Sequence, residues 1–258
     1  MLDIEVLSPD EIDKSAETFH RDGFVVVKDS LTPEQLEYAR EGAYRVIAEQ
    51  KAETPFEEAN GGYARYSYGQ QIHHPEWVML IDLPTILPIV DKIWGSEDYV
   101  CSGAGGDYSH PGAKIQHLHS DMHDVFKDPF GLSSTFDVPA PYIVVNFMMV
   151  DFKKVNGATR FIPCTHRTRQ RPPTLEDEPE WMKESIISGP AAAAIIRDVR
   201  CWHGGTPNDS DEIRPMTSVG YFAPWFRKKE LGPCLPRHLY EKLSDRGKQL
   251  CRYLVSET

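Results

Sequence analysis

The stretch Gln116-His117-Leu118-His119-Ser120-Asp121 decides how the rest of the chain is interpreted. It follows the turn signal Pro111-Gly112, so we place it on a β-strand or at the entrance to one. Residues two apart on a strand project from the same face, and His119 and Asp121 can therefore bring an imidazole nitrogen and a carboxylate oxygen to one point. One more histidine would complete two imidazoles and a carboxylate, the ligand set of non-haem Fe(II) that activates oxygen.

The candidate for the third ligand is His203, which lies 84 positions after His119 on a different predicted strand. This separation is typical of a closed or two-sheet β structure, in which distant strands face one cavity. Gly204 and Gly205 follow and would allow a sharp turn or the close approach of a ligand. Arg214 begins a further predicted strand, and its guanidinium could hold a carboxylate through two parallel hydrogen bonds. A 2-oxo acid at the metal could supply electrons for oxygen reduction, with Arg214 on its far carboxylate.

Signals for secondary structure place a β core between helical ends. Helices are expected from Ser8-Pro9 onward, for about four turns behind a Thr32–Gln35 capping box, and from Asp82 to a stop at Gly95. Strands are expected at 24–27, 142–150, 158–162, 191–199 and 215–225. Asn156-Gly157 predicts a hairpin between the second and third of these strands.

The chain shows no repeat or linker, so we predict one domain over 1–258. Its parts are helical support at about 8–95, a β core at about 98–226, a polar insertion at 167–189 and one helix at about 237–254. The insertion is interpreted either as a solvated loop or as a mobile lid over a site. Residues 52–80 are expected to form loops and short strands.

Composition narrows the class of protein. A net charge of −11 argues against nucleic acid and against anionic membrane surfaces as partners. No apolar run approaches the roughly 20 residues of a membrane span, and the N-terminus shows no signal peptide. Five cysteines without a C-x-x-C motif indicate reduced thiols, so a cytoplasmic protein is expected.

Three motifs in combination resemble the phytanoyl-CoA dioxygenase family of iron(II)/2-oxoglutarate oxygenases. They are the H-x-D at 119–121, N-G-A-T-R-F-I-P-C-T-H at 156–166, and W-H-G-G-T-P-N-D-S at 202–210 followed by Arg214. The resemblance runs from Asp22 to about Trp225. It implies a mainly β fold with flanking helices and a double-stranded β-helix (jelly-roll, cupin-like) core. One departure is Cys164, where relatives often carry Gly.

The same resemblance implies the site and its cofactors. Fe(II) is expected on His119, Asp121 and His203, and 2-oxoglutarate on Arg214. Gln116 and Thr159 are expected to contact this co-substrate, and O2 is the second co-substrate. The implied reaction oxidises, and by default hydroxylates, a small organic molecule while 2-oxoglutarate is converted to succinate and CO2.

The substrate class has two candidates. The match at Gln116 and the aromatic-rich residues 63–68 favour a small secondary metabolite, whereas the arginines of 160–171 could instead contact an anionic substrate such as an acyl-CoA. Arg65 and the tyrosines near it could line a pocket, although half-buried aromatics are commoner. A homodimer is compatible with these features.

Two other classes compete with this interpretation. The run His117-x-His119-x-Asp121-x-His123 resembles the H-x-H-x-D-H motif of metallo-β-lactamase-like zinc hydrolases, but Met122 stands where the final histidine should be. The other class is a non-catalytic cupin-like binding protein. Trp202 is predicted to pack in the core. The remaining histidines are predicted to be structural and the remaining aspartates solvated: His110, His117, His123 and His166, and Asp107 and Asp124.

Overall fold

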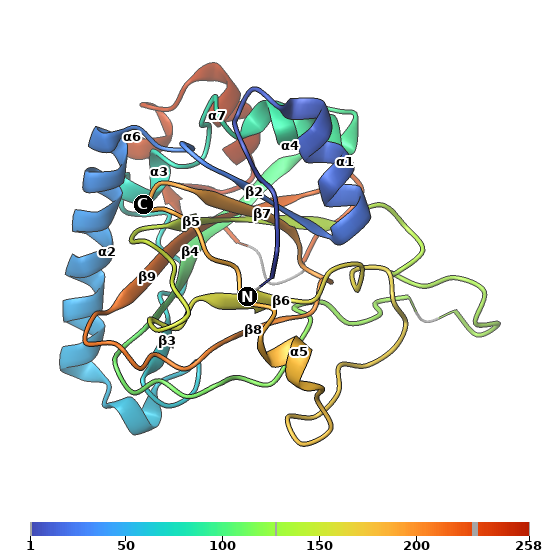
Figure 1. Ribbon diagram of the computed structural model, residues 1–258. Coiled ribbons are helices and arrows are strands. Elements are labelled where there is room, and N and C mark those ends of the chain that lie inside the picture. Colours follow the sequence, from blue (N-terminus) through green and yellow to red (C-terminus); the bar gives the residue numbers. More distant parts are fainter. Residues whose placement is uncertain (1, 127, 229–231, 258) are drawn as a thin grey trace.

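The computed structural model describes residues 2–126, 128–228 and 232–257. Its centre is a large sheet facing a small one (Figure 1). The large sheet has the order β1 (Val6–Leu7), β2 (Phe24–Val27), β7 (Ala194–Asp198), β5 (Tyr142–Met148), β9 (Arg214–Phe222), β4 (Val100–Ser109) and β3 (Arg65–Ser67). Every pair in it is antiparallel except β1 with β2.

The small sheet consists of β6 (Thr159–Phe161) and β8 (His203–Gly205), paired antiparallel. Single bridges extend it on both sides, from His203 to His119 and from Arg160 to Ile186. Four chain segments therefore lie side by side opposite the large sheet. This two-sheet arrangement is the architecture that the sequence predicted.

The predicted hairpin at Asn156-Gly157 is wrong. The turn itself forms, with Gly157 at φ +76°, but β6 pairs with β8 while β5 pairs with β7 and β9. The turn thus carries the chain from the large sheet to the small one. A two-residue turn signal describes the local backbone, whereas the strand that receives the next segment is chosen by tertiary packing.

Residues of the large sheet alternate between two environments. Val145, Ile196 and Val219 belong to the main hydrophobic core, whereas their strand neighbours Asn146 and Arg197 line a cavity between the sheets. This period of two is expected for a sheet with one helix-covered face. The helices therefore hold the sheet from behind, and its front face carries polar side chains such as Arg197 beside apolar ones such as Met148 and Ile195.

The covering helices are α1 (Ile12–Asp22), α2 (Pro33–Glu53) and α4 (Leu87–Trp94), with short α3 (Pro75–Val78) and the 3-10 turn η1 (Phe56–Glu58) (Figure 1). The capping box at Thr32 is confirmed, since its hydroxyl accepts from the Gln35 N–H and the Gln35 side chain accepts from the Thr32 N–H. α2 is longer than expected, at 21 residues. α1 and α4 begin later than predicted, because turns occupy residues 9–10 and 84–86.

The single helix expected at about 237–254 is wrong. Two short helices occupy this region, α6 (Arg237–Tyr240) and α7 (Asp245–Cys251), and β10 (Leu235–Pro236) pairs with β11 (Val255–Ser256). Ser244 interrupts the helix because its side chain accepts a hydrogen bond from the Gly247 N–H at 2.9 Å and so starts a new one. None of the described helices is long and apolar enough to span a bilayer.

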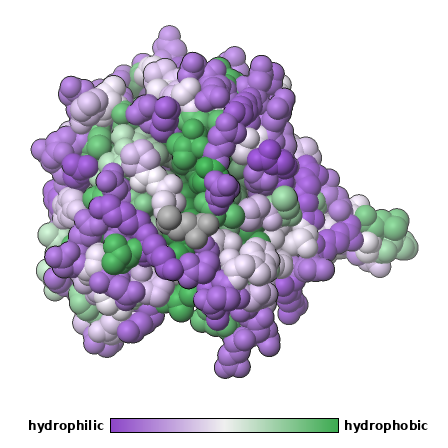
Figure 2. Space-filling view, in the orientation of Figure 1, coloured by the Kyte–Doolittle hydropathy of each residue, from purple (hydrophilic) through white to green (hydrophobic). Residues whose placement is uncertain are grey.

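Two long segments lie on the side of the small sheet. Residues 122–126 and 128–138 contain no helix or strand, and an apolar tip projects into solvent, with Phe130 82% and Leu132 80% exposed (Figure 2). Residues 167–189 contain only α5 (Glu180–Lys183). The last part of this polar segment is not loop, because Ile186 and Ile187 are buried against β6.

Candidate active site

The structure brings together the three residues expected to bind a metal. The ligand atoms of His119, Asp121 and His203 all lie within 4.8 Å of one another. Both imidazole Nε2 atoms are 3.6 Å from Asp121 Oδ1. His119 and His203 also exchange backbone hydrogen bonds of 2.9 and 3.0 Å, so the sheet register itself places the two imidazoles together.

Asp121 is held by Arg197 from strand β7 of the large sheet. Arg197 Nη1 lies 2.7 Å from Asp121 Oδ2, and its Nε donates to Asn146 Oδ1 at 2.9 Å. Burial would raise the pKa of Asp121, but Arg197 outweighs it and keeps that pKa well below its usual range. The carboxylate is therefore ionised, with Oδ2 engaged and Oδ1 directed toward the two imidazoles.

His203 is oriented from behind by the backbone. Its Nδ1 lies 2.9 Å from the Cys201 carbonyl oxygen, and its ring stacks on Phe161 with centroids 5.4 Å apart. Burial and the nearby Arg197 lower the pKa of His203 to about 3, so the imidazole is neutral. A neutral ring that donates through Nδ1 leaves Nε2 free to bind a metal.

A cavity of about 160 Å³ extends from these ligands between the two sheets and reaches Arg214. Arg214 is 1% exposed, and its Nε and Nη1 have no hydrogen-bond partner among the described residues. Burial lowers the pKa of its guanidinium to about 10. Unpaired buried donors are costly unless a ligand satisfies them, so Arg214 fits an anionic group placed in this cavity.

Arg65 and Asp107 also line this cavity. Arg65 is 3% exposed and donates to the Thr206 carbonyl at 2.7 Å, and burial together with Arg214 lowers its pKa to about 9. Asp107 is half-buried and burial raises its pKa, so the expectation of a solvated carboxylate is wrong. Two arginines against one acid make this end of the cavity attractive to an anion.

Gln116 and Thr159 line the same cavity, and their contact with the co-substrate stays a prediction. The Gln116 amide is already used by the backbone: its Nε2 donates to the Gly61 carbonyl and its Oε1 accepts from the Gly205 N–H. Gly205 lies in an extended strand rather than a sharp turn, and a Cβ there would lie 2.3 Å from the Arg65 guanidinium carbon. Its absent side chain therefore admits Arg65.

A family model described as phytanoyl-CoA dioxygenase (PhyH) matches residues 19–216, most of the chain. The chain belongs to the phytanoyl-CoA dioxygenase family. Membership confirms the expected enzyme class, a 2-oxoglutarate-dependent dioxygenase.

Known relatives are distant. The dioxygenase cdmA of Talaromyces verruculosus is 23% identical over 262 residues, which cover 94% of this chain and 82% of that protein. Solved structures similar to this chain include the following two. SnoN, a non-heme alpha-ketoglutarate-dependent epimerase from nogalamycin biosynthesis, gives a TM-score of 0.62 at 19% identity, covering 83% of this chain and 81% of its own. EctD from S. alaskensis, solved with 2-oxoglutarate and 5-hydroxyectoine, gives a TM-score of 0.60 at 17% identity. The match covers 81% of this chain and 75% of the EctD chain. These likenesses confirm the double-stranded β-helix fold.

The departure from the family pattern at Cys164 keeps the turn. Cys164 adopts φ +65°, the left-handed region that favours glycine, and its N–H donates to the Asp22 carbonyl at 2.9 Å. The next histidine, His166, is buried against Gly23, which supports a structural role. His110 is buried among the rings of Phe56, Tyr66 and Tyr108 and is likewise structural.

His117 and His123 are exposed and do not join the metal-binding group among the described residues. Trp202 packs against Leu118 and Ile162, as expected.

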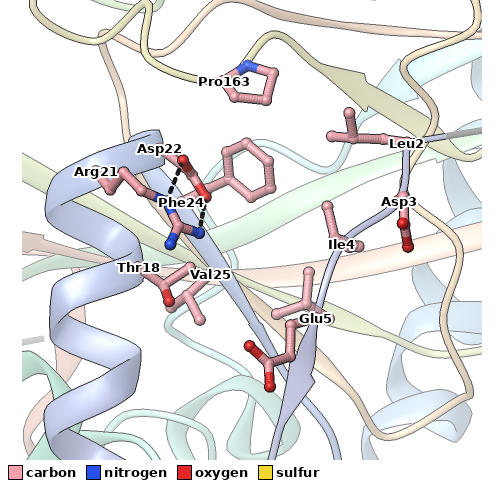
Figure 3. Close-up of a pocket in the computed structure, with 11 residues that line it drawn as sticks. Leu2, Asp3, Ile4, Glu5, Thr18, Arg21, Asp22, Phe24, Val25 and Pro163 are labelled. Carbon is pink, nitrogen blue, oxygen red and sulfur yellow. Dashed lines mark hydrogen bonds and ion pairs between the residues drawn. The ribbon is translucent and has the colours of Figure 1, made fainter.

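A further cavity of about 220 Å³ lies beneath the N-terminal segment (Figure 3). Its Arg21 and Asp22 pair with each other at 2.7 Å, so their charges are directed at one another.

Proposed function

We propose that this chain oxidises a small organic molecule, by default through hydroxylation, with Fe(II) bound by His119, Asp121 and His203. In this proposal 2-oxoglutarate occupies the cavity between the sheets, with one carboxylate on Arg214, and is converted to succinate and CO2. We also propose that the protein is cytoplasmic and that its partner is a small-molecule substrate, not nucleic acid or a membrane. A homodimer stays a prediction.

One observation carries this proposal. The three potential ligands line a cavity of about 160 Å³, and so does the buried Arg214, two of whose nitrogens have no hydrogen-bond partner among the described residues. A dicarboxylate could place one end on the metal and the other on the guanidinium. A metal site alone would give no reason to bury an arginine without a partner.

The chain's own residues would prepare the site for this chemistry. Bound Fe(II) supplies oxygen activation and the oxidation of an unactivated carbon. Arg197 holds Asp121 so that one carboxylate oxygen is presented to the metal, and the Cys201 carbonyl fixes the His203 ring. Phe161 and Met216 line the cavity and would keep water from it.

The zinc-hydrolase alternative requires His117 as a ligand, and the exposed position of this residue disfavours it. A non-catalytic binding protein would keep the fold without product formation. Both alternatives can be tested with the reaction itself, because neither yields succinate from 2-oxoglutarate.

The experiment combines anaerobic metal titration with detection of succinate. Wild-type protein should bind one Fe(II) and form succinate when oxygen is admitted, whereas His203→Ala should weaken iron binding by more than about 100-fold. His117→Ala, from the same segment, is the matched control and should bind iron as wild type does. Iron binding that survives His203→Ala, or depends on His117, would refute the assignment.

A further inference from the structure

A second and much larger cavity lies beside the candidate metal site. Its volume is about 1050 Å³, and its walls are residues 117–120, 122–124 and 169–176 together with Phe136 and Trp202. Among the described residues, His119 alone lines both this cavity and the smaller one. A molecule in the larger cavity would therefore lie next to the metal without occupying the co-substrate position.

The size of the larger cavity points to a bulky ligand. Pockets for drug-sized molecules span roughly 300–1,000 Å³, so this cavity lies at the top of that range. A small polar metabolite would leave most of it filled with water. A ligand gains binding free energy in proportion to the apolar surface that it buries, so a ligand that fills the cavity is favoured over one that leaves part of the wall in contact with water.

The walls are mainly apolar and partly rigid. Leu118, Met122 and Trp202 are at most 6% exposed and belong to the packed interior. Phe136 and Leu175 are half-buried and cover the cavity from the two long segments. Rings of fixed shape suit such walls, since they bury apolar area without losing internal freedom.

The charges around the cavity argue against coenzyme A. Its phosphate groups require clustered Lys and Arg. Of the two arginines that line the cavity, Arg169 already forms an ion pair with Asp137, and Arg171 is exposed at the rim. Asp124 and Glu176 line the same cavity and would repel phosphates. Arg171 is thus the one arginine outside an ion pair among the described residues of this lining, and a single arginine can recognise one acidic group.

We propose that the 1050 Å³ cavity binds the oxidisable substrate, and that this substrate is a bulky, mainly apolar, ring-containing molecule with at most one acidic group. This inference rests on the proposed function for its chemistry. It assigns residues 169–176 to substrate recognition and excludes acyl-CoA thioesters as the preferred class.

The test measures binding to protein loaded with Mn(II) and 2-oxoglutarate, so that no turnover occurs. The probes are deoxycholate as a ring-containing acid, palmitoyl-CoA, and L-proline as a small polar molecule. Deoxycholate should bind most tightly, and Leu175→Glu should weaken its binding by roughly 10-fold or more because a charge enters the apolar wall. Phe136→Ala should weaken it in the same direction.

Leu132→Glu is the matched control, since Leu132 is 80% exposed and lies outside the cavity lining. It should leave deoxycholate binding unchanged. The proposal would be overturned if palmitoyl-CoA or L-proline bound more tightly than deoxycholate. It would also be overturned if the Leu175→Glu and Phe136→Ala variants bound deoxycholate as tightly as wild type does. Succinate formation by wild-type protein is measured separately, so that a failure of the dioxygenase assignment is distinguished from a failure of the substrate class.

Discussion

Glu178→Ala should destabilise the protein far more than its place in an acidic loop suggests. Glu178 and Arg160 form an ion pair in which both side chains are 0% exposed. Arg160 also donates from Nη2 to the Gln116 carbonyl at 2.6 Å, which ties the base of the 169–176 segment to the extended segment that carries His119. The variant would leave the Arg160 guanidinium buried without its anion.

The expected cost follows from this burial. Removing one partner of a buried ion pair costs roughly 3–5 kcal/mol, because the desolvated charge that stays behind is uncompensated. For a chain of this length that corresponds to a melting temperature lower by roughly 6–20 °C. Arg160→Met combined with Glu178→Leu removes both charges and should recover most of the loss.

Urea denaturation of wild type, the single variant and the double variant measures these free energies of unfolding. Glu184→Ala is the control, because Glu184 lies on the same polar segment and forms an ion pair with Lys154. The Glu184 side chain is 40% exposed and the Lys154 side chain 59%, so this substitution should cost less than about 1 kcal/mol. If Glu178→Ala costs no more than Glu184→Ala, the pair does not anchor the segment.

Three further outcomes are expected. Arg214→Lys should raise the KM for 2-oxoglutarate by roughly 10-fold, because an ammonium keeps the charge but loses the paired hydrogen bonds; an unchanged KM would remove Arg214 from the co-substrate site. Cys164→Gly should raise the free energy of unfolding by about 0.5–1 kcal/mol, since φ +65° strains a residue with a Cβ; a lower value in urea denaturation would contradict this. Glu76→Gln should cost less than about 1 kcal/mol at neutral pH. Burial would raise the pKa of Glu76, but Arg45 lowers it below its ordinary 4.5, so its contribution is present above that pH and is lost as the pH falls through the lowered pKa. A difference from wild type that persists in acid would refute this role.

The pairing of His119 with Asp121 could be predicted because its signal is local, whereas His203 lies 84 positions away and had to be inferred as the third ligand from a different predicted strand. The period of two fixes which side chains share a face, and the position of a histidine at a strand end is readable from the pattern. The cap at Thr32 and the left-handed Gly95 are local in the same sense.

The surroundings of the site were harder to predict. Asp107 follows a glycine-rich run, and nothing nearby in the sequence reveals that Arg65 and Arg214 lie beside it. Arg197 left a trace, since an arginine inside an apolar strand implies a buried partner, but that partner is Asp121 from a distant segment. Glu178 looked solvated because its neighbours are acidic, and only the fold places it against Arg160.

The two backbone hydrogen bonds between His119 and His203 fix the geometry of the site, and this geometry does not depend on how many residues lie between the two histidines. A slip of one residue in this pairing would turn an imidazole to the opposite face, so the pairing is under strict constraint. Lengthening a flexible loop costs little free energy, and the loops at 122–138 and 167–178 both fall between the two histidines. Descendants of this chain could therefore gain or lose residues in either loop, and acquire new substrates, while inheriting the same metal geometry.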